Sequence, residues 1–265
     1  MSQKSLNRRH FAGALAGLAA TQTVSPAMSP AEPTQRTKFY LMETFQLRQG
    51  TQLARLGDWL NQAYLPRLSK VHTGPQIVLE SVIAPHNPQL VLLVGYSSME
   101  QLGAVQGKLD ADSELGAAFA KIEKDPEPLF DNQINTLLEA APYSPEVAME
   151  KHPKPRLFEL RTYHSPTWSQ HRAVHERFAG PEIKVFHKCG IHPILYTSTI
   201  IGENMPNLTY LIPFESLAAR EKAWDAFAVD PDWIKARKES VDKGGQIVAV
   251  TDLSIYRAAA YSPVS

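Results

Sequence analysis

The chain has 265 residues, with 27 basic and 27 acidic side chains, an isoelectric point near 7.1 and 43% hydrophobic residues. A balanced charge gives no global field that would attract nucleic acid or an anionic membrane, so we expect no nucleic-acid partner. Outside the N-terminal segment no apolar run is long enough to cross a bilayer, so we expect no stable membrane insertion.

Residues 1–31 have the pattern of an export signal. A short basic start containing Arg8 and Arg9 precedes an apolar, small-residue stretch over 11–20 and a Pro-rich tail over 21–31. The Arg pair, with Phe11 two positions later, resembles the twin-arginine signal. We therefore predict export to the periplasm or the extracellular space, with the twin-arginine export machinery as a partner. A general secretory signal and a disordered tail are the alternatives.

After this signal the chain repeats itself at a shift of 118 residues. Tyr-Ser-Pro occurs at 143–145 and again at 261–263, and the same shift carries Asp112 onto Asp230. A duplicated unit fixes the number of domains and their symmetry. We predict two repeats, at 38–145 and 156–263, joined by a Pro-rich linker.

Each repeat reads as strand, helix, strand, strand, helix, strand. The first helices are expected to kink or split at Pro66 and Pro181. The second helices are expected to begin at Ser97 or Ser98 and at Ser216, with Ser97 and Glu100 at capping-box spacing. The strands after the first helices are predicted at 77–84, 90–96 and 134–138, and at 194–201, 208–214 and 247–257.

The predicted strands 90–96 and 208–214 are almost continuously apolar, which favours burial on both faces. A unit of this order forms a four-stranded antiparallel sheet with both helices on one face, the ferredoxin-like arrangement. The open face of each sheet needs a partner, and the tandem copy is the nearest one. The sequence therefore predicts an α+β protein whose two ferredoxin-like (βαββαβ) repeats form an α/β barrel within one chain. Homo-oligomerisation stays open.

Three motifs distinguish the second repeat: Phe-Glu-Leu-Arg-Thr-Tyr at 158–163, Lys-Cys-Gly-Ile at 188–191, and Asp-Pro-Asp-Trp at 230–233. Together they resemble the NIPSNAP domain, of which the first repeat is a degraded copy, with Glu43 in place of Arg161 and Leu115 in place of Trp233. The resemblance implies the dimeric α/β barrel group, which includes cofactor-independent monooxygenases and haem-binding enzymes. It implies no particular reaction.

Polar side chains alternate along the first strand of the second repeat. Glu159, Arg161 and Tyr163 share the face turned away from the residues expected to meet the helices, so we expect them to point into the barrel. Asp252 and Tyr256 share one face of the last strand. An Arg with carboxylates and phenols in one cavity would orient a small polar or aromatic ligand. The alternative is a buried structural network.

Arg161 is the residue of greatest interest, because its counterpart in the first repeat is Glu43. Either the two side chains pair across the pseudo-two-fold axis, or Arg161 is free to hold an anionic or phenolate ligand.

His171 and His175 lie one helical turn apart. Such a pair can chelate a metal, but the sequence shows no third ligand, so we expect a solvated helix face and no metal site. A second cluster is expected to diverge around a helix end: His187, Cys189 and His192.

The leading hypothesis is an exported protein that binds an unknown small molecule in its barrel, with a cofactor-independent oxygenase-type reaction as its enzymatic form. No cofactor is predicted; haem, the alternative, would need an axial His directed into the barrel. The competing hypothesis is a non-enzymatic structural or interaction module. An open polar cavity between the sheets favours the first, and a barrel filled by Phe, Tyr and Leu favours the second. The catalytic residues and the substrate are unidentified.

Overall fold

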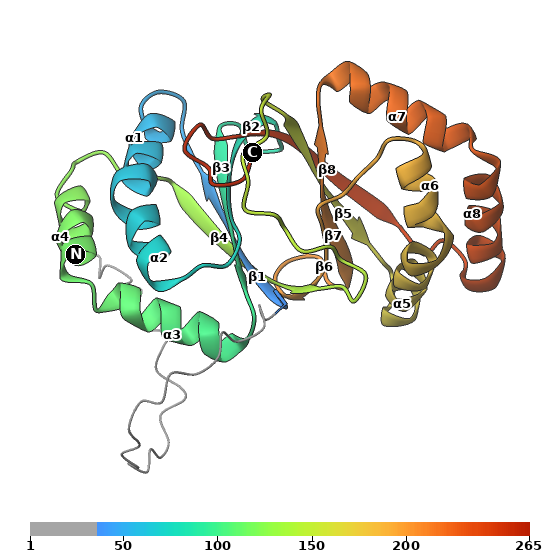
Figure 1. Ribbon diagram of the computed structural model, residues 1–265, viewed down its shortest axis with the longest axis horizontal. Helices are drawn as coiled ribbons and strands as arrows, with labels where there is room; N and C mark the ends of the chain where they lie inside the picture. The colour runs from blue at the N-terminus through green and yellow to red at the C-terminus, as the bar shows by residue number, and fades with distance from the viewer. Residues whose placement is uncertain (1–35) are drawn as a thin grey trace, which may run out of the picture. The chain divides into compact units, whose positions relative to one another are not determined.

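Two four-stranded sheets close into one eight-stranded antiparallel barrel in the computed structural model, which describes residues 36–265 (Figure 1). The predicted signal, with Arg8 and Arg9, lies outside the described residues. The strands are β1 (Phe39–Gln46), β2 (Gln76–Ile83), β3 (Gln89–Tyr96), β4 (Asn132–Ala140), β5 (Leu157–His164), β6 (Leu195–Ile201), β7 (Asn207–Phe214) and β8 (Val250–Ala258).

The strand order confirms two ferredoxin-like repeats. The first repeat forms the sheet β4-β1-β3-β2 and the second forms β8-β5-β7-β6. The barrel closes where β2 pairs with β8 and β4 pairs with β6, so each seam joins one repeat to the other. All of the residues of β3 are buried, as its apolar sequence predicts.

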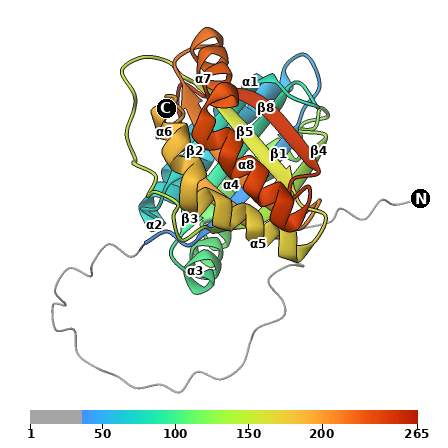
Figure 2. The same ribbon diagram turned by 90° about the vertical axis from the view of Figure 1, so that its right-hand side faces the viewer.

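The helices of each repeat cover the outer face of that repeat's sheet, as Figures 1 and 2 show. The α-helices are α1 (Gln52–Trp59), α2 (Leu65–Val71), α3 (Met99–Asp110), α4 (Ser113–Ile122), α5 (Trp168–Arg177), α6 (Ile183–Lys188), α7 (Leu217–Val229) and α8 (Pro231–Gly244). Within the described residues, no helix is both long and apolar enough to cross a membrane.

Both first helices are split by a π-helical segment, as the prolines predict. The segments η2 (Leu60–Tyr64) and η3 (Phe178–Glu182) are related by the same shift of 118 residues. Pro66 follows the first and Pro181 lies inside the second. Proline lacks an N–H and clashes with the preceding turn, so a regular α-helix cannot continue through it.

The second helix of each repeat consists of two helices rather than one. Asp112 and Asp230 cap the second members, α4 and α8, through hydrogen bonds accepted from backbone N–H groups of the first helical turn. Ser98 and Ser216 cap α3 and α7 as predicted. The predicted Ser97 capping box is one residue out of register, because Ser98 is the cap.

The repeated Tyr-Ser-Pro motif fastens each repeat to the other. The Ser144 hydroxyl accepts a hydrogen bond from the backbone N–H of Tyr196 at 3.0 Å. The Ser262 hydroxyl accepts one from the backbone N–H of Val78, also at 3.0 Å. Each motif follows the last strand of one repeat, and its serine accepts a hydrogen bond from a backbone N–H in a strand of the other repeat. The repeated motif thus links the two repeats reciprocally through two serine hydrogen bonds, which we call the clasps.

The barrel interior is filled by side chains from both sheets. A space of only about 10 Å³ remains among them, too little for any organic ligand. Of the two sequence-based outcomes, the structure shows the packed barrel. The buried residues that fill it are Tyr40, Ile77, Leu79, Val91, Leu93, Leu138, Val147, Phe158, Leu195, Leu211, Tyr256 and Val264.

Candidate functional site

The polar face of β5 points away from the barrel interior. Phe158 and Leu160 contact the interior cluster, whereas Tyr163 packs in the core between the second sheet and its helices. The prediction that Glu159, Arg161 and Tyr163 face inward is therefore wrong. The closed barrel is lined by apolar side chains, so the alternate, polar set lies beneath the helices.

Glu159 is the centre of a buried network that ties β5 to α7. Its carboxylate accepts hydrogen bonds from Arg161 Nη1 at 2.8 Å, Arg220 Nε at 2.6 Å and Trp224 Nε1 at 3.0 Å. Glu159 is fully buried, and the Arg161 guanidinium lies 4.2 Å from the centroid of the Trp224 ring. Three donors satisfy one carboxylate, which is the structural network that we considered as the alternative.

Of the two alternatives for Arg161, its pairing with Glu43 is not found. Glu43 accepts a hydrogen bond from Gln133 Nε2 at 2.6 Å within its own repeat. It shares the helix-covered face of β1 with Phe45, which packs in the core of the first repeat. Arg161 instead pairs with Glu159 on the outer face of the other sheet.

Asp252 and Tyr256 lie on the opposite face of the second sheet from Arg161. Tyr256 is buried inside the barrel, where Gln89 donates a hydrogen bond to its hydroxyl, and burial raises the pKa of the phenol. Asp252 is exposed near the end of β8 and bonds His164 Nε2 at 2.6 Å. The five predicted ligand residues therefore do not form one site.

A second buried ion pair lies beside the π-helical segment η3. Arg177 Nε donates to Glu182 Oε2 at 2.7 Å, and the Arg177 guanidinium lies 5.0 Å from the centroid of the Trp233 ring. Glu182 is fully buried. Burial disfavours its charged form and raises the pKa of the carboxyl to about 6, although Arg177 opposes the shift.

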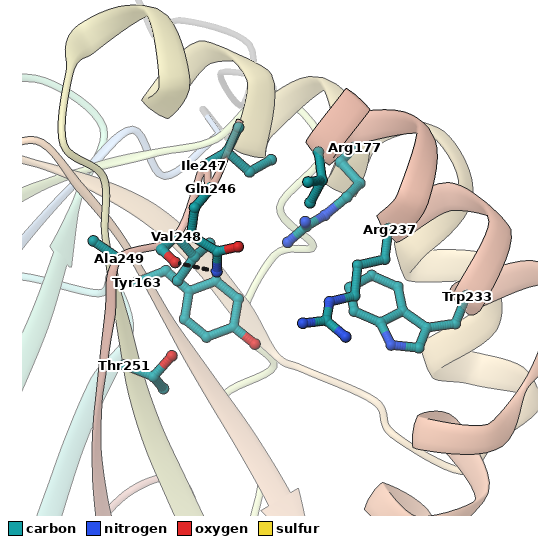
Figure 3. A pocket seen from close by; sticks show the side chains of 10 residues that line it. Tyr163, Arg177, Trp233, Arg237, Gln246, Ile247, Val248, Ala249 and Thr251 are labelled. Atoms are coloured by element: carbon teal, nitrogen blue, oxygen red, sulfur yellow. Dashed lines mark hydrogen bonds between the residues drawn. The ribbon is translucent and has the colours of Figure 1, made fainter. Parts of the chain in front are cut away.

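Arg177 also lines a cavity of about 260 Å³ on the outer side of the second repeat (Figure 3). Figure 3 shows the guanidinium groups of Arg177 and Arg237 directed toward the space beside the Tyr163 ring. Trp233 forms another wall. The remaining lining comes from Val241 at the end of α8, residues 246–249 after it and Thr251 of β8.

The charge of this pocket is positive. Arg177 is neutralised by Glu182, but the Arg237 guanidinium has no carboxylate partner among the described residues. Burial raises the pKa of Tyr163, so its phenol stays protonated and can donate a hydrogen bond. Guanidinium groups bind carboxylates in a forked geometry, and aromatic walls favour a planar ring. The pocket can therefore hold a small aromatic anion.

The histidine predictions also change. His171 is buried and His175 half-buried, so the expectation of a solvated helix face is wrong. Burial lowers the pKa of both rings, that of His175 to about 4. The rings of His187 and His192 stack at 5.0 Å rather than diverging. Residues 36–265 contain no group of three or more His, Cys, Asp or Glu side chains placed to hold a metal ion.

Sequence reasoning identified Tyr163 but not the two arginines of the pocket, because its candidate ligand-binding residues were all on strands, whereas Arg177 and Arg237 lie on α5 and α8. One signal was available. Arg177 and Glu182 are five positions apart across Pro181, which is the spacing of neighbours in a π-helical turn. The residues missed are Arg177, Glu182, Arg220, Trp233 and Arg237.

Comparison of the whole fold with solved structures finds other barrels of this kind. A proposed monooxygenase from Lactobacillus acidophilus matches with a TM-score of 0.51 and 10% identity, over 83% of this chain and 94% of its own. A proposed monooxygenase from Fusobacterium nucleatum has a TM-score of 0.53 and 9% identity, over 84% and 93%. An anthrone oxidase-like protein has a TM-score of 0.51 and 12% identity, over 84% and 92%. Such identities show the fold alone.

The sequence comparison is narrower. No curated protein matches the chain. The NIPSNAP family matches residues 158–263, which contain every residue of the pocket and of the Glu159 network. The region that matches the NIPSNAP family thus forms one half of a closed α/β barrel.

Proposed function

We propose that this protein binds a small aromatic anion, a carboxylate or phenolate, in the pocket between α5, α8 and β8 of the second repeat. The observation that carries the proposal is the convergence of Arg177 and Arg237 on one cavity walled by Tyr163 and Trp233. Its volume of about 260 Å³ fits a ligand with one or two rings. The packed barrel interior offers no competing space.

Each lining group has a distinct part in this proposal. Arg237, which has no carboxylate partner within residues 36–265, supplies the net positive charge and lies on the exposed side of the pocket. Arg177 is held in place by Glu182 and by the Trp233 ring, so it presents its remaining N–H donors in a fixed direction. The Tyr163 phenol offers a further hydrogen bond.

Binding can be tested with 4-hydroxybenzoate and its neutral analogue 4-hydroxybenzyl alcohol by isothermal titration calorimetry. We expect the anion to bind and the alcohol to bind at least ~10-fold more weakly, since a hydrogen bond to a charged group contributes about 1.5–3 kcal/mol. Arg237→Gln should reduce affinity for the anion by a similar factor. Arg172→Gln, at an exposed position of α5 outside the pocket, is the matched control. Equal binding of anion and alcohol would refute the anion site.

A cofactor-independent oxygenase-type reaction is the enzymatic form of this proposal. Such a reaction begins with ionisation of an electron-rich phenol, which needs a base and a cation to hold the phenolate. Arg177 and Arg237 provide the cations, Glu182 holds Arg177 in place without lining the pocket, and solvent at the open side takes the proton. Oxygen consumption in the presence of hydroquinone, above the rate given by Glu182→Gln, would support it. Equal rates would remove it.

The second candidate is a non-enzymatic structural or interaction module. The filled barrel favours it, because a shared core of this kind needs no ligand to be stable. Absence of any small molecule in native mass spectra of the purified protein, together with absence of binding in the titrations above, would make it the better account.

Export by the twin-arginine route is part of the proposal and rests on the sequence of residues 1–31. We expect Arg8→Lys with Arg9→Lys to leave the full-length protein in the cytoplasm, because Lys does not reproduce the guanidinium donors. Fractionation of cells with active general secretion tests this, and unimpaired export would remove the assignment.

A further inference from the structure

The helix α5 presents two imidazoles to the second sheet, away from the anion pocket. His171 and His175 lie one turn apart, and their rings meet edge to face with centroids 4.6 Å apart. The pair packs against β6 and β7, where Ser198 and Asn207 lie. Neither the Glu159 network nor the pocket uses these residues.

Three side-chain donor atoms meet at this place, and a backbone carbonyl lies beside one of them. His171 Nε2 and His175 Nε2 are 3.1 Å apart. The Ser198 hydroxyl lies 2.8 Å from His175 Nε2 and 3.4 Å from His171 Nε2. The backbone carbonyl of Asn207 lies 3.0 Å from His171 Nε2. Two imidazole nitrogens and the Ser198 hydroxyl oxygen thus lie within 3.4 Å of one another, and the Asn207 carbonyl adjoins one of them, His171 Nε2.

These separations of 2.8–3.4 Å are those of hydrogen bonds, and three of the four are shorter than the spacing in a metal's coordination shell, so an ion would move the side chains slightly apart. A tetrahedral ion with metal–nitrogen bonds of ~2.0–2.1 Å holds its ligand atoms ~3.3–3.4 Å apart. As a purely hydrogen-bonded pair, one Nε2 must donate to the other, which fixes opposite tautomers. A metal ion takes the lone pairs of both nitrogens at once.

The surroundings also suit a metal. The Tyr143 hydroxyl lies 2.8 Å from His175 Nδ1, the ring nitrogen that faces away from the cluster. A hydrogen bond at this second nitrogen is the usual device that orients a metal-binding imidazole.

We propose that His171 Nε2, His175 Nε2, the Ser198 hydroxyl and the Asn207 carbonyl form a binding site for one divalent transition-metal ion, Cu²⁺ or Zn²⁺. Imidazole nitrogens select these ions over Mg²⁺ and Ca²⁺, and the general order of affinities places Cu²⁺ above Zn²⁺. No carboxylate or thiolate takes part, so the ion keeps its full charge.

The first repeat lacks this site. The same shift of 118 residues places Leu53 and Gly57 where His171 and His175 lie, and Glu80 where Ser198 lies. The proposal therefore requires a stoichiometry of one ion per chain.

Calorimetric titration with Cu²⁺, and separately with Zn²⁺, tests the proposal on the folded protein. We expect one site per chain, tighter for Cu²⁺, and no response to Mg²⁺. His175→Gln should lower the Cu²⁺ affinity by more than ~10-fold. Tyr143→Phe, which removes only the hydroxyl behind His175, should lower it by ~10–100-fold, the range for such supporting residues.

His187→Gln is the matched control, because His187 and His192 form a second, more exposed imidazole pair. It should leave the Cu²⁺ affinity unchanged. If His187→Gln abolishes binding and His175→Gln does not, the ion belongs to that surface pair and the proposal is wrong. Absence of binding to the wild-type protein overturns it equally.

Pulsed electron paramagnetic resonance of the wild-type protein with one equivalent of Cu²⁺ keeps the test decisive if a His175 variant does not fold. Two coupled imidazole nitrogens are expected. A spectrum with one imidazole nitrogen, or none, contradicts the site.

Discussion

The two repeats share one backbone and differ in what lies between the sheet and the helices. At five equivalent positions of this layer the first repeat carries an apolar side chain and the second carries a charged group, an imidazole or a phenol, whereas at a sixth both are charged, Glu43 and Arg161. The equivalent pairs are Leu41 and Glu159, Leu53 and His171, Trp59 and Arg177, Leu92 and Tyr210, and Phe119 and Arg237.

This difference distinguishes side chains that the fold requires from side chains that are available for function. At the five apolar positions the first repeat shows that charged groups are not needed there to hold the helices on the sheet. Buried ion pairs contribute little more to stability than well-packed apolar side chains would, and often less. The polar layer of the second repeat is therefore not required by the barrel, and the NIPSNAP match covers that repeat alone.

The largest expected effect on stability comes from replacing Glu159 of the second repeat by the equivalent residue of the first. Glu159→Leu copies Leu41 but leaves Arg161, Arg220 and Trp224 without their shared acceptor. We expect a loss of about 3–5 kcal/mol in the free energy of unfolding, measured with urea. Adding Arg161→Met and Arg220→Leu should recover most of it. A loss below ~1 kcal/mol for the single variant would show that the network is not electrostatically coupled.

The shared clasps should instead respond alike in both repeats. Ser144→Ala and Ser262→Ala each remove the acceptor of a buried strand N–H, at Tyr196 and Val78. Each should cost about 1–3 kcal/mol in urea unfolding. Strongly unequal losses would mean that the barrel seams are not equivalent.

The free energy of unfolding should depend on pH through the Glu182 carboxyl. Its pKa is raised from 4.5 to about 6 in the folded protein. Between these values the unfolded chain loses its proton first, so the free energy of unfolding falls as pH rises and the loss is complete above the folded pKa. Relative to Glu182→Gln, we expect wild type to lose on the order of 1–2 kcal/mol between pH 4.5 and 6.5. A constant difference across that range would indicate an ordinary carboxyl pKa.

The smallest expected effects on stability are at two equivalent positions, Phe119 and Arg237. Phe119 packs against Trp59 with ring centroids 6.3 Å apart, whereas Arg237 is exposed at the pocket. Phe119→Gln should cost about 1 kcal/mol and Arg237→Gln less than ~0.5 kcal/mol. Thermal denaturation measures both. A larger loss at Arg237 would make it a structural residue.

Much of the fold follows from the sequence. The shift of 118 residues, the apolar third strands and the two prolines predict the duplicated barrel and its split helices. The duplicated barrel and the split helices could be predicted because they depend on local sequence patterns and on the need to bury the open face of each sheet.

The site was harder to predict. The alternation of Glu159 and Leu160 defines two faces of β5, but both are buried, so the pattern cannot say which one meets the barrel interior. The pocket combines Tyr163 of β5 with Arg177 and Arg237 from two helices distant in sequence. Their meeting depends on how α5 and α8 pack, which no local pattern contains.

The central claim is that ligand binds beneath the helices of the second repeat and not inside the barrel. Methyl-detected nuclear magnetic resonance during titration with 4-hydroxybenzoate tests it directly, since both places carry methyl groups. The account predicts shifts at Val241, Ile247 and Val248 in the pocket, with Leu79, Leu93 and Leu211 in the barrel unchanged. Shifts centred on the three barrel leucines, or no shifts at all, would contradict it.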